Sequence, residues 1–91
     1  MSLRERISAE LTRTFSPTAL AVVDESHLHA GHAGSRPGGE THFRIHLVSS
    51  AFDGKGRLER HRMIYAALAQ EIADGVHALA LRAQAPGEDD R

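Results

Sequence analysis

The chain has 91 residues, 41% of them hydrophobic and 25% charged, a composition that fits one small globular domain and leaves no room for a second. Eleven basic and twelve acidic side chains give a formal net charge of −1, which is not the charge of a general nucleic-acid-binding protein. Because the chain has no cysteine, it cannot contain a disulfide scaffold, a Cys-ligated zinc site or a thiol nucleophile. The unusual number is seven histidines, whose neutral imidazoles are common metal ligands.

The longest unbroken apolar run is the seven-residue segment Met63–Ala69. A membrane-spanning helix needs about 20 such residues, so the chain is not expected to cross a bilayer. The charged start, Met1–Arg6, lacks the apolar segment of a signal peptide. We therefore expect a cytoplasmic protein that does not associate with membranes.

The first half of the chain predicts a helix, a strand and a long loop. Ser2 and Glu5 fit a capping box, and an apolar residue then recurs every fourth position, which predicts a helix over 3–15. The short Val-bearing segment 19–26 predicts a strand. Residues 27–39 contain four glycines, a proline and three histidines and predict a loop, and loops of this length are often functional.

The second half predicts a strand, a helix and a strand. In 40–49, apolar residues alternate with His and Arg, the period of a half-buried strand. A helix follows over 57–73, ended by Gly75, and the residues assigned to its buried side are Leu58, Ile64, Tyr65, Leu68, Ala69 and Ile72. A third strand is predicted over 76–83, followed by a polar, flexible tail over 84–91.

The element order helix, strand, strand, helix, strand predicts an α+β sandwich. The first two strands can pair antiparallel across the loop, and the helix between the second and third lets these two run parallel. The expected architecture is a three-stranded mixed sheet with the helices packed on one face. It forms a single domain over 1–91, with its core in about 3–83.

Six of the seven histidines fall in three places. His27, His29 and His32 lie in the loop, where they form either a solvated Gly/His segment, an adventitious zinc or nickel site, or a specific ligand set. His77 heads the third strand and, judged alone, is a partly buried sheet-end histidine more often than a ligand. The strand histidines at 42 and 46 alternate with the apolar positions, which predicts a structural role on the opposite strand face.

A basic cluster surrounds the start of the main helix, and its members are Lys55, Arg57, Arg60, His61 and Arg62. A solvated face is the simplest interpretation. Cations at a helix N-terminus oppose its dipole, however, so the cluster favours a use such as docking a partner or a phosphate backbone.

The carboxylates that flank the loop, Asp24, Glu25 and Glu40, are assigned to strand-end hydrogen bonding rather than acid–base catalysis. The Gly31–Gly34 segment spells the Gly-x-x-Gly of a KH nucleic-acid clamp but lies between strands, so we treat it as coincidental.

Four segments, in order and spacing, resemble the BolA family, and the resemblance covers about residues 3–83. They are Val-Asp-Glu-Ser at 23–26, Glu-Thr-His-Phe at 40–43, Arg-His-Arg-Met-Ile-Tyr at 60–65 and Gly-Val-His-Ala-Leu-Ala-Leu at 75–81. The resemblance implies a fold like the class II KH domain, in agreement with the predicted element order.

The resemblance also implies a function in iron–sulfur cluster assembly, trafficking and iron homeostasis. BolA-like proteins pair with a monothiol glutaredoxin and share a 2Fe–2S cluster with it, while the glutaredoxin cysteine and glutathione supply thiolates. Carried over by position, the ligands from this chain are His77 and a loop histidine, His29, with His32 as the runner-up. The isolated chain is then expected to be a monomer without a tightly bound cofactor and without enzymatic activity.

Two other functions remain open from the sequence. Some BolA-like proteins are described as DNA-binding transcriptional regulators, and the basic cluster at 55–62 would then grip phosphates. A third hypothesis is a zinc or heme site formed by the loop histidines without a protein partner. The cluster hypothesis requires His77 and a partner, the DNA hypothesis requires Arg57, Arg60 and Arg62, and the third requires the loop histidines alone.

Overall fold

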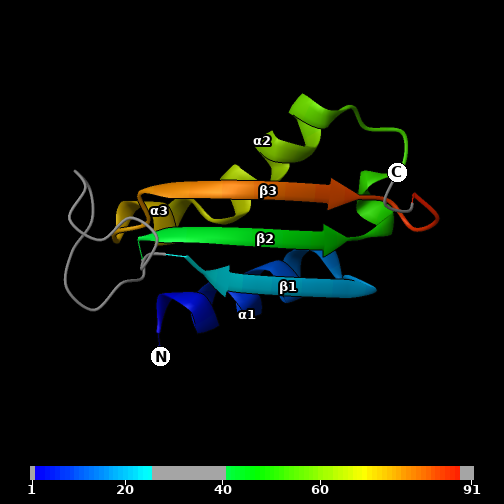
Figure 1. The fold of residues 1–91 in the computed structure, drawn as a ribbon. Helices are drawn as coiled ribbons and strands as arrows, with labels where there is room; N and C mark the ends of the chain where they lie inside the picture. Colours follow the sequence, from blue (N-terminus) through cyan, green and yellow to red (C-terminus); the bar gives the residue numbers. More distant parts are fainter. Residues whose placement is uncertain (1, 26–40, 89–91) are drawn as a thin grey trace.

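A computed structural model describes residues 2–25 and 41–88 (Figure 1). The elements follow the order α1 (Leu3–Phe15), β1 (Ala19–Asp24), β2 (His42–Val48), the 3-10 helix η2 (Ser50–Phe52), α2 (Arg57–Ala67), α3 (Ala69–Ala73) and β3 (Ala78–Gln84). The sheet order is β1-β2-β3, with β1 antiparallel and β3 parallel to the central strand. The helices lie on one face of this sheet, which confirms the predicted α+β architecture.

Helix α1 has the predicted bounds because both of its ends are coded locally. The Ser2 hydroxyl accepts a hydrogen bond from the Glu5 N–H, and the Glu5 carboxylate accepts one from the Ser2 N–H, which completes the capping box. Ser16, at φ 45°, ends the helix in the left-handed conformation just before Pro17. The four-residue stripe Leu3, Ile7, Leu11 and Phe15 is buried along its whole length.

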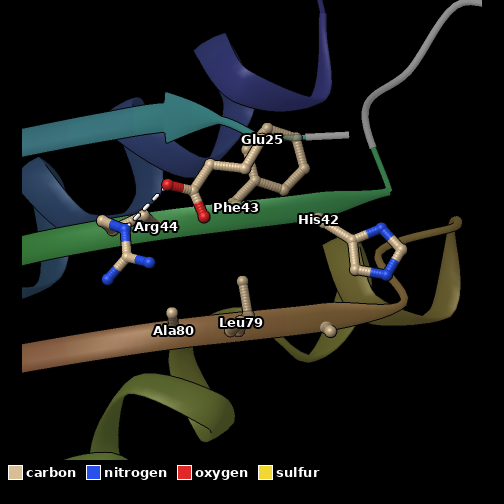
Figure 2. A pocket seen from close by; sticks show the side chains of 7 residues that line it. Glu25, His42, Phe43, Arg44, Leu79 and Ala80 are labelled. Atoms are coloured by element: carbon tan, nitrogen blue, oxygen red, sulfur yellow. Dashed lines mark hydrogen bonds and ion pairs between the residues drawn. The ribbon is translucent and has the colours of Figure 1, made fainter. Parts of the chain in front are cut away.

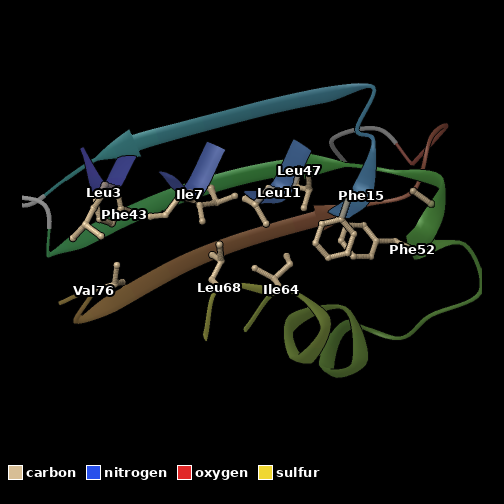
Figure 3. Packing of buried hydrophobic residues seen from close by; sticks show 12 residues of the cluster. Leu3, Ile7, Leu11, Phe15, Phe43, Leu47, Phe52, Ile64, Leu68 and Val76 are labelled. Carbon is tan, nitrogen blue, oxygen red and sulfur yellow. The ribbon is translucent and has the colours of Figure 1, made fainter. Parts of the chain in front are cut away.

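The core lies between this stripe, the central strand and α2 (Figure 3). Phe43, Ile45 and Leu47 point from β2 into it, and each is at most 1% exposed. Ile64 of α2 and Leu68, which follows the last residue of α2, close the core from the other side and are fully buried. The apolar side of β2 therefore faces the core, as its alternating pattern predicted.

The predicted main helix is two helices with a break at Leu68, whose φ of −102° and ψ of 17° leave the helical range. The predicted buried side was also wrong at three positions, since Leu58 is 63% exposed, Tyr65 is 45% exposed, and Ala69 is exposed. Positions 58 and 64 are six residues apart and so lie about 120° apart around a helix. Ile64 faces the sheet, and Leu58 therefore cannot.

The predicted polar tail, 84–91, was wrong at its first two residues, which belong to the fold. Gln84 is the last residue of β3, and Ala85 is 2% exposed within the core. The Glu88 carboxylate accepts hydrogen bonds from the Ala85 N–H and from the Arg60 guanidinium. The bond to Arg60 joins Glu88 to a residue 28 positions earlier, a contact that polar composition alone does not predict. Within the described residues, no helix is both long enough and apolar enough to cross a membrane.

An ion pair between α1 and the end of α3 predicts a pH-dependent stability. The Arg6 guanidinium lies 2.5 Å from the Asp74 carboxylate and, through this hydrogen bond, lowers the pKa of Asp74 below its ordinary value of 3.8. A carboxyl whose pKa is lowered by folding stabilises the protein above its unfolded pKa, and that contribution disappears as the pH falls through the folded pKa. We expect Asp74→Asn to be slightly less stable than wild type at neutral pH and equal to it in strong acid. Urea unfolding at both pH values tests this, and a gap that persists in acid would contradict it.

Candidate functional site

His77 stands exposed at the end of the sheet where β3 begins. The chain reaches it from α3 through Gly75, whose φ of 139° is a conformation that favours glycine. Val76, 7% exposed, anchors the turn in the core, and the next side chain therefore points outward. The His77 N–H donates to the Thr41 carbonyl at 2.7 Å, so the backbone is held while the imidazole remains accessible.

His42 lies beside His77, with the two ring centroids 5.1 Å apart and the planes tilted by 56°. Unlike its neighbour it is only 8% exposed, and its Nδ1 lies 2.8 Å from the Thr41 hydroxyl. The side chain is on the strand face opposite Phe43, as predicted, and it packs against the candidate ligand. Sequence analysis missed this pairing because it depends on the parallel register, in which His42 is the partner of Ala78.

Both ends of the 26–40 segment are attached next to this histidine pair. The chain leaves the described region after Glu25, whose N–H donates to the His42 carbonyl at 2.8 Å. It returns at Thr41, whose carbonyl accepts from both His77 and Ala78. The predicted loop ligands, His29 and His32, lie outside the described residues, as does His27, so their roles stay predictions.

A pocket of about 260 Å³ opens between β2 and β3 next to these residues (Figure 2). Its rim carries the Glu25 carboxylate, which accepts a 2.7 Å hydrogen bond from the Arg44 guanidinium. This bond raises the pKa of Arg44. Glu25 thus forms the strand-end hydrogen bond predicted for it. Ala78 and Ala80 line the pocket on the β3 side, where their small side chains leave room.

Arg60 does not belong to the predicted basic surface. Its side chain is 12% exposed, donates to the Lys55 and Ala83 carbonyls, pairs with Glu88 and lies 5.9 Å from the Phe52 ring. The carboxylate of Glu88 raises the pKa of Arg60 through their hydrogen bond. The remaining cluster is different: Lys55, Arg57 and Arg62 are exposed, and His61 is half-buried.

The start of α2, where the basic cluster lies, and His77 are at opposite ends of the sheet. The Arg60 side chain binds the carbonyl of Ala83, near the end of β3, whereas His77 precedes the first residue of that strand. Seven strand residues separate these ends by about 20 Å. Among the described residues, no three His, Asp or Glu side chains are grouped closely enough to hold a metal ion by themselves. His77 can therefore offer one imidazole nitrogen, and further ligands would have to come from elsewhere.

Comparisons with known proteins agree with this architecture. The family model for BolA-like proteins matches residues 11–88. The BolA domain of SufE1 from Arabidopsis thaliana superimposes with a TM-score of 0.88 and 43% identity, covering 98% of each chain. These results define the chain as a small α+β domain of the BolA type.

The curated relatives lead to the same conclusion. The DNA-binding transcriptional regulator BolA of Escherichia coli K12 is 52% identical over 81 residues, which is 89% of this chain and 73% of the relative. An uncharacterised protein in the cobS 5′ region of a Sinorhizobium species is 48% identical, covering 100% of this chain and 99% of the relative. The chain belongs to the BolA-like protein family.

Proposed function

We propose that this chain binds a monothiol glutaredoxin and that the two proteins share a 2Fe–2S cluster. The observation that carries the proposal is the position of His77, an exposed imidazole on a fixed backbone at the point where both ends of the 26–40 segment are attached. His29, with His32 as the runner-up, is the proposed second ligand. The chain then acts as an adaptor in cluster assembly or trafficking and not as a catalyst.

The donor chemistry supports this proposal. Neutral imidazole is a good iron ligand, and two histidines on one iron are found in Rieske-type 2Fe–2S centres. The chain has no thiol of its own, so the cysteine ligands would come from the glutaredoxin and from glutathione. Because a ligating imidazole must be deprotonated, cluster sharing should weaken in mild acid.

The proposal is tested by titrating a cluster-loaded, glutathione-bound monothiol glutaredoxin with the chain. Visible absorption and circular dichroism report the ligands of the cluster. A new spectrum that saturates at one chain per glutaredoxin supports the shared cluster. An unchanged spectrum, or cluster loss without a new species, would remove the proposal.

A second candidate function is binding to DNA. It is favoured by the DNA-binding function of the Escherichia coli relative and by three exposed cations around the start of α2, Lys55, Arg57 and Arg62. Each phosphate neutralised by a cation contributes about −0.9 to the slope of log affinity against log salt concentration. Three contacts therefore predict a slope of about −3.

Fluorescence anisotropy of a labelled DNA duplex over a salt series checks this prediction. Arg62→Ala should reduce the slope by about 1, because it removes one phosphate contact. Arg4→Ala, which removes an exposed cation from α1, serves as the matched control. A slope near zero, or an equal effect of the two substitutions, would argue against a specific role of α2 in DNA binding.

A further inference from the structure

The outward side of α2 carries two large apolar side chains that the core does not use. Leu58 is 63% exposed and Tyr65 is 45% exposed. They are seven residues apart, so they lie within about 20° of each other around the helix and about 10 Å apart along it. Arg62 lies between them on the same side. A helix of a small domain normally turns such a stripe toward the core.

This orientation is held by contacts on the inner side of the helix. Ile64 is fully buried, and Arg60 is tied to the Ala83 carbonyl and to Glu88. Rotating α2 to bury Leu58 and Tyr65 would pull both residues out of these contacts. The apolar pair is therefore a fixed feature of the surface, and both side chains are accessible to a partner.

Most of the charged side chains around this pair are positive. Lys55, Arg57 and Arg62 form no ion pair with any of the described residues, in contrast to Arg6, Arg44 and Arg60. Glu59 is the one carboxylate within the α2 sequence. Cations near a helix N-terminus also oppose the helix dipole, so an acidic partner would remove an existing repulsion.

We propose that the outward face of α2, formed by Leu58, Arg62 and Tyr65 with Lys55 and Arg57 beside it, docks an acidic amphipathic helix of a partner protein. The 10 Å spacing of Leu58 and Tyr65 matches apolar anchors two turns apart on a helix. Carboxylates flanking those anchors would meet the free cations. Duplex DNA fits this face less well, because two large apolar side chains would then face phosphates.

This surface is distinct from the cluster site. The start of α2 lies toward the end of the sheet where β3 ends, and His77 lies at the end where β3 begins (Figure 1). A partner helix anchored at the start of α2 therefore does not occupy the position of His77. The docking surface does not depend on the proposed cluster function.

The test uses a phage-displayed library of random 16-residue peptides, selected on the wild-type chain and counter-selected on a Leu58→Gln, Tyr65→Ser double variant. The selected peptides are expected to carry a net negative charge and apolar residues at helical spacing. Their affinities, measured by fluorescence anisotropy, should fall at least about tenfold with Leu58→Ala, Tyr65→Ala or Arg62→Glu. Val23→Ala, which trims a side chain of similar exposure (48%) on β1, should have no effect.

Each alternative outcome is decisive. The proposal would be overturned by selected peptides that are neutral or basic, or by peptides that bind the double variant equally well. It would also be overturned by a selection that yields no binding peptide. Binding of a DNA duplex that depends on Arg62 and Arg57 but not on Leu58 would assign the face to nucleic acid instead. Peptide binding by His77→Ala at wild-type affinity supports the independence of the two sites, and loss of peptide binding in that variant would refute it.

Discussion

Replacing His77 with alanine is expected to abolish the spectral change of a cluster-loaded monothiol glutaredoxin without unfolding the chain. The side chain is exposed, and the bond to Thr41 comes from the backbone N–H, which alanine retains. Losing even an outer-shell partner of a metal ligand costs about 10–100-fold in affinity. The loss of a ligand itself should therefore weaken binding of the cluster-loaded partner by at least this much, as measured by visible circular dichroism titration.

His61→Ala is the matched control for this prediction. His61 is a half-buried histidine on α2, away from the end of the sheet that holds the candidate ligand, and its removal should leave the spectrum of the complex unchanged. With His77 established, His29→Ala and His32→Ala distinguish the two candidate loop ligands. A His77→Ala variant that gives the wild-type spectrum would show that the cluster is held by other groups.

The elements that were predicted correctly depend on local signals. Helix α1 carries its capping box, its four-residue apolar repeat and its terminating Ser16-Pro17 within its own sequence. The alternation in β2 is likewise a local pattern with a two-residue period. The sheet order follows because a helix between β2 and β3 permits a parallel connection.

The elements that were predicted wrongly depend on contacts between distant residues. Arg60 was placed on a basic surface by its neighbours in sequence, whereas its position is set by Phe52, Ala83 and Glu88. The same contacts turn Leu58 outward and hold Glu88 against the fold. The pairing of His42 with His77 requires the strand register, which apolar periodicity within a single strand does not specify. The candidate ligand His77 could thus be predicted from the sequence, but the residues that surround it could not.

Phe52→Ala is expected to cause the largest loss of stability of any substitution considered for this chain. Phe52 is fully buried in η2, its ring centroid is 5.1 Å from that of Phe15, and the Arg60 guanidinium lies above it. Removing a buried phenylalanine side chain costs about 3–5 kcal/mol, while a domain of this size has about 5–15 kcal/mol in total. At about 4–8 °C per kcal/mol, Tm should fall by at least about 12 °C.

Leu58→Ala provides the comparison that makes this prediction specific. Both wild-type residues are large and apolar and lie close in sequence, but Leu58 is 63% exposed, and its truncation should change the free energy of unfolding by no more than about 0.5 kcal/mol. Urea unfolding with unchanged m-values measures both effects. Equal destabilisation by the two substitutions would mean that α2 is rotated relative to the orientation described, with Leu58 in the core. In that case the docking surface would not exist, whereas the position of His77 at the start of β3 would be unaffected.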